Sequence, residues 1–176
     1  MHAIQDSGAW VDMGTILAPF MTRPMSSGVY AIPNIECRTT SVVTNTTPTV
    51  AYRGAGRPEA TAAIERAMDM FAAEIGIDAA EVRRVNLIPK FMEPHTTAIG
   101  GTYDVGDYEE SLNRTLEASD YAGWRKKQAE RRANNDPKQL GIGVSVYVEI
   151  TGGVGTGESA KVEVLDDGSA RIYTGT

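Results

Sequence analysis

Apolar residues between positions 58 and 75 recur every three or four residues, which is the spacing of one face of an α-helix. They are Ala60, Ile64, Met68, Phe71 and Ile75. The charged residues of this stretch are expected on the opposite, solvent-facing side: Glu59, Glu65, Arg66, Asp69 and Glu74. Pro58 suits a first helical position and Gly76 suits a helix end. The pattern predicts a helix over 58–75 whose Ile64, Met68 and Phe71 side chains pack on neighbouring strands.

Three further helices are predicted from residues that suit helix N-caps. Asp78, Asp107 and Asp120 each precede a helical stretch. Glu81 and Glu110 stand three residues after the first two caps, at the spacing of a capping box. The apolar pairs expected to face inward are Val82 with Val85 and Leu112 with Leu116. Pro89 is expected to end the first of these helices, and residues 134–137 the last.

Strand patterns flank this block of helices. Thr and Val are dense in 35–51, which predicts two strands joined by a turn at 45–48. Apolar and polar residues alternate over 144–150, and residues 166–168 (Asp-Asp-Gly) predict a hairpin turn between 160–165 and 170–173. Residues 1–30 are rich in Gly, Pro, Ser and Met, and are expected to be irregular and poor in strand.

This order of elements predicts an α+β fold, in which a mixed sheet is packed with helices. Strands and a candidate loop occupy 1–57, a helical block occupies 58–136, and strands with a hairpin occupy 137–176. We expect these three parts to belong to one domain, because 176 residues suit a single globular unit.

Composition excludes several classes of protein. With 41% hydrophobic and 23% charged residues, the chain is neither disordered nor collagen-like. It has no apolar run near the roughly 20 residues of a membrane-spanning helix. The 17 Lys and Arg residues stand against 23 Asp and Glu, for a net charge of -6, which argues against a general nucleic-acid surface. We interpret the basic run within 125–132 as the solvated face of a helix.

Cysteine and histidine are scarce. Cys37 is the single cysteine, which excludes an internal disulfide and a Cys-rich zinc site. His2 and His95 are far apart in the sequence, so a histidine metal cage is not expected. The N-terminus lacks the basic stretch and apolar core of a secretory signal. These features predict a cytoplasmic protein, with Cys37 as a small buried or edge residue and His95 at the surface.

Residues 50–60, VAYRGAGRPEA, have the pattern of a strand, a Gly-x-Gly turn and a helix N-terminus. Glycine permits a close backbone approach, and the N–H groups and dipole of a helix N-terminus favour an anion or an oxygen ligand. Arg53 and Arg57 flank the turn and can add charge-assisted hydrogen bonds. Gly-x-Gly before a helix also serves plain tight packing, and the residues alone leave both interpretations open. The third glycine of a dinucleotide fingerprint is absent.

The segment AYRGAGRPEA at 51–60 resembles the cofactor-loop motif of the molybdenum hydroxylases, the family of xanthine dehydrogenase, aldehyde oxidase and the large subunit of aerobic carbon monoxide dehydrogenase. The likeness is greatest to form II members of the last group, whose signature is AYRGAGR. Further segments match in the family's order and spacing, so that the resemblance covers nearly the whole chain. They are AIPN at 31–34, RVNLI at 84–88, YDVGDY at 103–108 and LGIG at 140–143.

The resemblance implies a fragment of a molybdopterin-binding large subunit, whose cofactor is molybdenum on a pyranopterin dithiolene (molybdopterin or molybdopterin cytosine dinucleotide). Family members hydroxylate a carbon centre of an aldehyde, heterocycle or related small substrate with oxygen from water. They pass the electrons to iron–sulfur and flavin subunits or domains. Carried over by position, the cofactor-binding residues are Ala51, Tyr52, Arg53, Gly54, Ala55 and Gly56. Of these, 51–53 face the cofactor, and Gly54 and Ala55 lie on the substrate side.

Two loop residues depart from the family's patterns. Gly54 stands where members that oxidise carbon monoxide carry a copper-binding cysteine, so carbon monoxide is not the expected substrate. Ala55 stands where xanthine and aldehyde enzymes often carry a phenylalanine that stacks on an aromatic substrate. The substrate pocket is therefore expected to differ from both groups.

The family's catalytic glutamate and its Gly-Gln-Gly cofactor motif do not occur within 1–176. We therefore expect an excised fragment with no catalytic residue and no metal ligand of its own, inactive alone and prone to self-association through exposed apolar surface. A non-catalytic structural or assembly domain with the same fold is the alternative. Glu149 is expected to be an outward-facing charge, and Glu158 to lie in a flexible glycine-rich loop.

Overall fold

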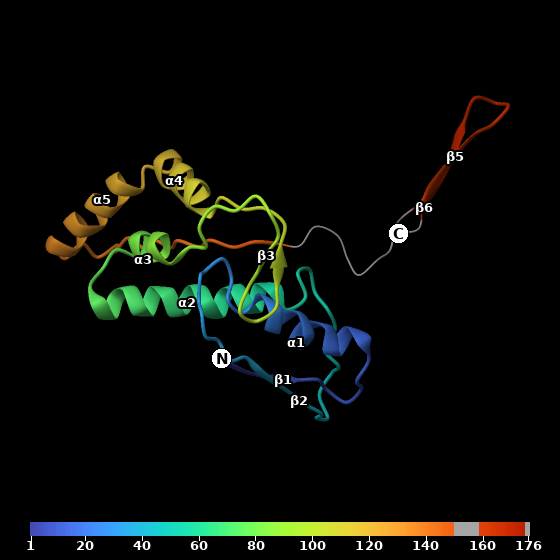
Figure 1. Ribbon diagram of the computed structural model, residues 1–176, viewed down its shortest axis with the longest axis horizontal. Helices are drawn as coiled ribbons and strands as arrows, with labels where there is room; N and C mark the ends of the chain where they lie inside the picture. The colour runs from blue at the N-terminus through green and yellow to red at the C-terminus, as the bar shows by residue number, and fades with distance from the viewer. Residues whose placement is uncertain (150–158, 175–176) are drawn as a thin grey trace.

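The computed structural model describes residues 1–149 and 159–174. Helices predominate, and the strands form three small two-stranded sheets (Figure 1). This mixture confirms the predicted α+β class. In chain order the elements are β1 (His2–Asp6), α1 (Met13–Met25), β2 (Arg38–Val42), α2 (Arg57–Ile75), α3 (Ala79–Asn86), β3 (His95–Thr96), β4 (Thr102–Tyr103), α4 (Tyr108–Ala118), α5 (Tyr121–Ala133), β5 (Ala160–Val164) and β6 (Ala170–Thr174).

Helix α2 runs through the middle of the body, and α1 and α3 pack against it (Figure 1). Its start and end are the predicted ones. Pro58 lies in the first turn, and Gly76 closes the helix in the left-handed conformation, with its N–H bonded to the carbonyl of Ala72. Glycine adopts this conformation without the cost that a Cβ brings.

The buried face of α2 differs in part from the predicted one. Ala60 and Met68 are buried as expected, but Phe71 is 49% exposed and Ile75 44% exposed. Glu65, expected in solvent, is buried. The helix also packs on α1 and α3 rather than on strands. The apolar pattern missed this arrangement because Glu65 is buried against Arg83, and a pattern of apolar residues alone does not show a buried ion pair.

The prediction of an irregular segment at 1–30 is wrong, because it contains β1 and α1. The side chain of Asp12 accepts a hydrogen bond from Thr15 N at 2.9 Å, and Thr15 Oγ1 accepts one from Asp12 N, which forms a capping box. The sequence did not predict α1 because Pro19 and Pro24 lie within it, and proline is unfavourable inside a helix. Its buried side also includes Thr15 and Thr22, so it lacks a continuous apolar stripe.

The Thr-rich region 35–51 forms one strand instead of two. β2 pairs in parallel with β1, His2 opposite Arg38, whereas 43–56 contains no strand. Threonine side chains hold this stretch against β1: Thr44 and Thr46 donate to the Asp6 carboxylate at 2.7 and 3.1 Å, and Thr49 donates to the Asp6 carbonyl at 3.2 Å. Side-chain hydrogen bonds, together with two backbone bonds between 8–9 and 44–46, thus replace the regular ladder that β propensity predicted.

The alternating segment 141–149 is extended, and within the described residues it pairs with no strand. Its burial alternates as predicted: Val144, Val146 and Val148 are partly buried against the core, and the residues between them are exposed. The predicted hairpin is confirmed, because β5 and β6 pair antiparallel around a turn in which Gly168 has a φ of 82°. Ile150 and Glu158 lie outside the described residues.

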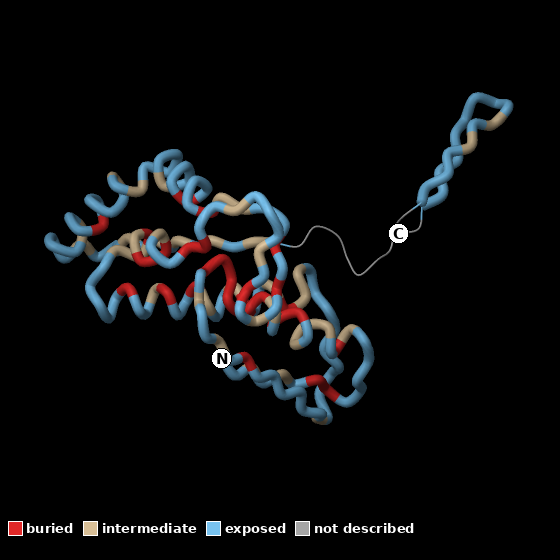
Figure 2. The backbone as a smooth tube through the Cα atoms, viewed as in Figure 1, coloured by how far each residue is buried: buried red, intermediate tan, exposed pale blue. Residues whose placement is uncertain are grey.

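The core gathers residues from α1 to α4 and from the loops between them (Figure 2). Tyr103 fixes one loop by donating a hydrogen bond to the Gly28 carbonyl at 2.7 Å. Cys37 is buried, as expected, whereas His95 is half-buried beside the ring of Phe91. The remaining buried members are mostly apolar: Met25, Val29, Tyr30, Ala60, Met68, Ala72, Val82, Leu87, Ile88, Tyr108 and Leu112.

The later helices begin at their predicted caps. Asp78, Asp107 and Asp120 each accept a hydrogen bond from a backbone N–H of the first turn. The inner face of α3 was only half predicted, since Val82 is buried but Val85 is 70% exposed. The capping box expected at Glu81 is replaced by an ion pair with Arg84.

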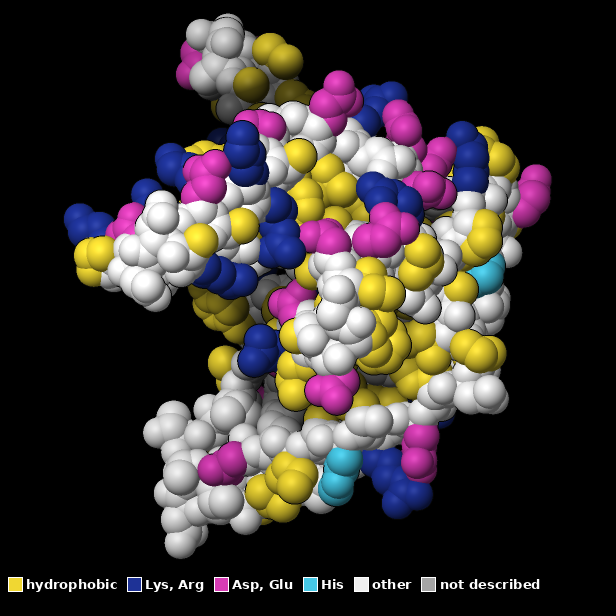
Figure 3. Space-filling view, turned by 90° about the vertical axis from the view of Figure 1, so that its left-hand side faces the viewer, with side chains coloured by type: hydrophobic (Ala, Val, Ile, Leu, Met, Phe, Trp, Pro, Cys, Tyr) yellow, Lys and Arg dark blue, Asp and Glu magenta, His cyan; other side chains and the backbone are white. Residues whose placement is uncertain are grey.

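The basic run lies on α5, where Lys126, Lys127 and Arg132 are exposed, which confirms its interpretation as a solvated face. Arg125 pairs with Asp78 at 3.0 Å. On the face shown in Figure 3, Lys and Arg side chains are interspersed with Asp and Glu. Within the described residues, the chain has no helix with the length and apolar character needed to span a membrane.

Candidate functional site

The loop that joins 51–52 to α2 is a tight turn over residues 53–56. Gly54 and Gly56 both have φ of 93°, and Ala55 between them has φ of 37°. Ala55 N donates to the Tyr52 carbonyl at 2.8 Å, and Arg57 N donates to the Gly54 carbonyl at 3.1 Å. Among the described residues, no side chain caps the N-terminus of α2. Arg57 N–H and Ala60 N–H donate to the carbonyls of Gly54 and Gly56, and Pro58 has no N–H, so Glu59 N–H is the donor of this turn left for an outside acceptor.

Gly56 has a packing role. A Cβ at this position would lie 2.0 Å from the carbonyl oxygen of Ala18, and Thr22 Oγ1 donates to the Gly56 carbonyl at 3.0 Å. At Gly54 a Cβ would lie 2.6 Å from the ring of Pro58. Any other residue at either glycine would therefore displace the loop from α1 or from its own helix.

The loop and the first turns of α2 form one wall of a cavity of about 560 Å³. The opposite wall is the extended segment 141–149, through the side chains that its alternation turns away from the core. The lining residues are Arg53, Gly54, Arg57, Pro58, Thr61, Ala62, Ser145, Tyr147 and Glu149. The fold thus joins the predicted cofactor loop to a segment far away in the sequence.

Positive charge predominates among the lining residues. Arg57 Nε lies 3.0 Å from Glu149 Oε1, and Arg57 also donates to the Gly54 carbonyl at 3.1 Å. Glu149 is exposed on the side turned away from the core, as expected, and it also lines the cavity in this ion pair. Arg57 Nε is buried and, among the described residues, has no aligned hydrogen-bond acceptor. Because Arg53 adds a second guanidinium, the cavity favours a negatively charged or oxygen-rich ligand.

The predicted loop residues differ in their access to this cavity. Arg53 and Gly54 line it. Tyr52 is 88% exposed and Ala51 is exposed, whereas Ala55 is half-buried and Gly56 is buried against α1. The loop therefore presents residues 51–54 outward, and Gly56 fixes its position.

Sequence reasoning missed the second wall. Ser145 and Tyr147 received no role, although the period-two pattern already implied that residues 145, 147 and 149 share one side of the segment. The pattern does not show which part of the molecule that side faces. This is set by the tertiary packing of Val144 and Val146 on the core.

One helical turn beyond Thr61 on α2, Glu65 belongs to a buried polar cluster. Arg83 Nε donates to Glu65 Oε2 at 2.8 Å, and a further Arg83 nitrogen pairs with Asp69 at 2.9 Å. The Tyr30 hydroxyl donates to Glu65 Oε1. Burial, together with this hydrogen bond to the carboxylate, raises the pKa of Tyr30 well above its usual range. The donors Tyr30 and Arg83 therefore both carry their protons at neutral pH.

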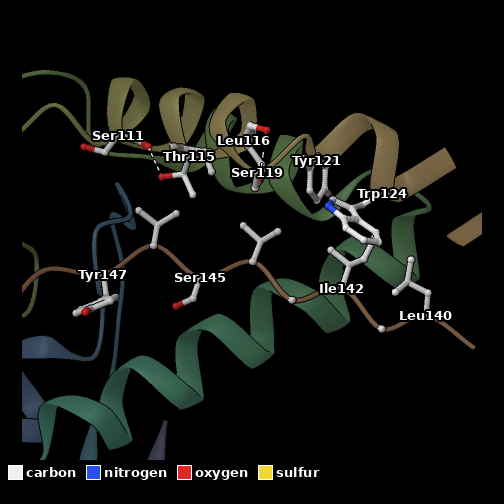
Figure 4. Close-up of a pocket in the computed structure, with 15 residues that line it drawn as sticks. Ser111, Thr115, Leu116, Ser119, Tyr121, Trp124, Leu140, Ile142, Ser145 and Tyr147 are labelled. Atoms are coloured by element: carbon white, nitrogen blue, oxygen red, sulfur yellow. Dashed lines mark hydrogen bonds between the residues drawn. The ribbon is translucent and has the colours of Figure 1, made fainter. Parts of the chain in front are cut away.

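A larger cavity of about 690 Å³ lies on the other side of the extended segment, under α4 and α5 (Figure 4). In Figure 4, Ser145 points toward α2 and away from the wall formed by Thr115 and Leu116. The lining of this groove contains no charged side chain and is mainly apolar, with Leu112, Trp124 and Ile142 among its members. It offers no chemistry comparable to that of the smaller cavity. No cluster of potential metal ligands occurs among the described residues.

Comparison with known proteins identifies the family. Two family models, each described as a molybdopterin cofactor-binding domain, match residues 1–87 and 114–176. The chain belongs to the molybdopterin cofactor-binding family of the molybdenum hydroxylases. The family resemblance seen in the loop motif is thereby confirmed. The cavity lies between the two matched regions, since the loop belongs to the first and the extended segment to the second.

The relatives are much longer than this chain. The carbon monoxide dehydrogenase large chain of Hydrogenophaga pseudoflava is 40% identical over 163 residues, covering 85% of this chain and 20% of that protein. The 6-hydroxypseudooxynicotine dehydrogenase complex subunit gamma of Paenarthrobacter nicotinovorans is 33% identical, covering 96% and 21%. The chain therefore spans about a fifth of the length of these molybdopterin-family relatives.

Solved structures of the family show the same fold. Quinoline 2-oxidoreductase from Pseudomonas putida 86 matches with a TM-score of 0.83 at 30% identity, over 97% of this chain and 23% of that one. A Cu,Mo-CO dehydrogenase matches with a TM-score of 0.82 at 29% identity, over 99% and 24%. The arrangement of the described elements is therefore that of a part of a molybdopterin-binding subunit.

Proposed function

We propose that this chain forms part of the active-site wall in the large subunit of a molybdenum hydroxylase. The parent enzyme oxidises an aldehyde, heterocycle or related small substrate in the cytoplasm, and hydroxylates it with oxygen from water. The observation that carries this proposal is the cavity between the two family-matched regions, where Arg53 and Gly54 of the cofactor loop face Ser145 and Tyr147.

The residues of this wall fit a molybdopterin. Such a cofactor carries phosphate and many polar ring atoms, and the guanidinium groups of Arg53 and Arg57 provide donors for them. We assign cofactor contacts to the loop Ala51, Tyr52, Arg53, Gly54, Ala55 and Gly56.

When bound, the molybdenum cofactor supplies the two-electron oxidation and the transferable oxygen, and iron–sulfur and flavin partners take up the electrons. The residues of this chain bind and position. Arg53 and the loop backbone hold negative or polar groups, and Gly54 and Ala55 leave room for a substrate because their side chains are absent or small. Gly54 has no side chain to bind copper, so the proposed substrate is not carbon monoxide. Glu149 is ion-paired with Arg57, so we place the catalytic base elsewhere in the parent subunit.

The alternative, a non-catalytic assembly domain, has less support. The relatives that match this chain are named as dehydrogenases and hydroxylases. The charged cavity is also a feature that an assembly role does not require.

The test compares two arginine variants of the full parent subunit, isolated with its partners. Arg53→Ala removes a cavity donor of the loop, and Arg66→Ala removes an exposed arginine of α2. A hydrogen bond to a charged group contributes about 1.5–3 kcal/mol, so Arg53→Ala should weaken cofactor retention about ten- to hundredfold. Molybdenum and pterin per subunit are measured after dialysis. Equal content in both variants, or no cofactor in the parent subunit, would overturn the proposal.

A further inference from the structure

The extended wall of the cavity is attached to the body at very few points. Between 141 and 148, and within the described chain, Val146 N–H is the backbone group that has a hydrogen-bond partner. It donates to Glu65 Oε2 at 3.1 Å. Val146 lies between Ser145 and Tyr147, both of which line the cavity. The position of these two side chains therefore depends on the bond at Glu65 together with the packing of the neighbouring valines on the core.

Glu65 is itself held rigidly. Its side chain is 8% exposed, and the facing side chain of Arg83 is fully buried. Arg83 also donates hydrogen bonds to the carbonyls of Ala79 and Glu65 and forms an ion pair with Asp69. Tyr30 adds a hydrogen bond to the second carboxylate oxygen. A carboxylate with both oxygens occupied in this way has little freedom to shift, because each movement breaks a charge-assisted bond.

The geometry relates Glu65 directly to the cavity. Thr61 and Ala62 line the cavity from α2, and Glu65 lies three to four residues later on the same side of that helix. Its bond to Val146 thus holds the extended segment against α2, one helical turn from the residues that line the cavity. The Arg57–Glu149 ion pair holds the same segment at the other end of the cavity.

We propose that Glu65 is a positioning residue of the active site: through Val146 N–H it fixes Ser145 and Tyr147 at the distance from the cofactor loop that the substrate requires. It touches neither substrate nor cofactor. This inference rests on the proposed function for its effect on catalysis, but the bond to the extended segment is independent of that function. In Glu65→Gln the amide oxygen can still accept from Arg83 and Val146, but it carries no negative charge, and the amide NH2 replaces the oxygen that accepts from Tyr30. The substitution therefore weakens the bond to Val146 N–H.

The test uses the assembled parent enzyme and two readouts. The first is amide hydrogen exchange of 141–149, and the second is the division of any activity loss between kcat and KM. Glu65→Gln should raise exchange of the Val146 amide about tenfold. It should raise KM for substrate while the molybdenum content stays at the wild-type level. Tyr103→Phe is the control, because it deletes a buried hydrogen bond of the core that does not involve the segment.

A second pair of variants tests the same bond if Glu65→Gln does not fold. Val146→Pro removes the N–H that Glu65 accepts, whereas Val144→Pro removes a valine on the same side whose N–H has no partner in the described residues. A higher KM confined to Val146→Pro would support the clamp. Equal effects of both proline variants, or unchanged exchange in Glu65→Gln, would overturn it. If exchange responds but the parent enzyme binds no molybdenum cofactor, the clamp stands and the proposed function fails.

Discussion

The helical body and the β5–β6 hairpin are built from equally regular sequence patterns, yet they differ in what covers them. In the body, charged Arg83 is fully buried by partners on α2 and α3. In the hairpin, Val162, Val164 and Ile172 are 63–75% exposed, and Figure 2 shows this arm almost wholly exposed. A regular local pattern therefore specifies an element, but it does not specify what packs on that element.

The two faces of the hairpin make the point in detail. Lys161, Glu163 and Tyr173 interact with one another on one face. The other face carries the apolar residues of both strands: Ala160, Val162, Val164, Ala170 and Ile172. An isolated two-stranded hairpin is marginally stable in water. Because the chain spans about a quarter of the solved quinoline 2-oxidoreductase chain that it matches, we expect the rest of the parent subunit to cover this face.

The largest contrast is expected between two arginines. Arg83→Ala leaves Glu65 buried without its charge partner, which should lower the free energy of unfolding by about 3–5 kcal/mol. Arg171→Ala in the hairpin should change it by less than about 0.5 kcal/mol, since the residue is exposed. Urea denaturation of the 176-residue chain followed by circular dichroism measures both. Similar values for the two variants would remove the distinction between body and hairpin.

Two isoleucines sharpen the same contrast in apolar packing. Ile88 is 2% exposed, and Ile88→Ala should cost about 2–5 kcal/mol of unfolding free energy. Ile172 is 65% exposed, so Ile172→Ala should have almost no effect on the 176-residue chain. In the full parent subunit it should become destabilising, because its face is then covered. Thermal unfolding of both lengths decides this, and a neutral Ile172→Ala in the full subunit contradicts the expected cover.

Self-association should depend on the hairpin face. We expect the 176-residue chain to associate through its exposed apolar surface, and the double change Val162→Asp with Ile172→Asp should shift sedimentation velocity toward the monomer. Val85→Asp, at an exposed apolar residue of α3, is the matched control and should have the smaller effect. If the control disperses the chain equally well, the hairpin face is not the adhesive surface.

The smallest expected effect is a loss of stability at high pH. Burial raises the pKa of Tyr103 from 10.0 to about 12. A raised pKa favours the neutral phenol in the folded chain, so this contribution is complete below pH 10 and is lost as pH rises toward 12. Phenolate absorbance should show a tyrosine titrating near pH 12 that Tyr103→Phe removes, while Tyr30 titrates later still. Titration of every tyrosine near pH 10 in the folded chain would contradict it.

Much of the fold could be predicted, because its signals are local. The ends of α2 follow from Pro58 and Gly76, and the starts of α3, α4 and α5 follow from their aspartate caps. Helix α1 was missed because Pro19 and Pro24 suggest irregular structure, although the Asp12–Thr15 box stabilises its first turn. The prediction of a second strand in 35–51 was wrong. Thr44 and Thr46 bond to Asp6 through their side chains there.

Only one of the two walls of the candidate site could be predicted from the sequence. The loop 51–56 was found because its motif is continuous in sequence. The other wall, including Ser145 and Tyr147, depends on Glu65 and Val146, which lie 81 positions apart. The spacing of apolar residues gives no sign that a carboxylate is buried and accepts a backbone N–H. Glu65 can be buried because it is paired with Arg83, which lies elsewhere in the sequence.

The most direct test of the central claim is a crystal structure of the full parent subunit, with molybdenum located by its anomalous scattering. The account predicts that the cofactor lies against residues 51–56 and that its polar groups accept hydrogen bonds from Arg53 or the loop N–H groups. Ser145 and Tyr147 should face it across the cavity. Molybdenum remote from this cavity, with the loop in contact only with protein, would contradict the account.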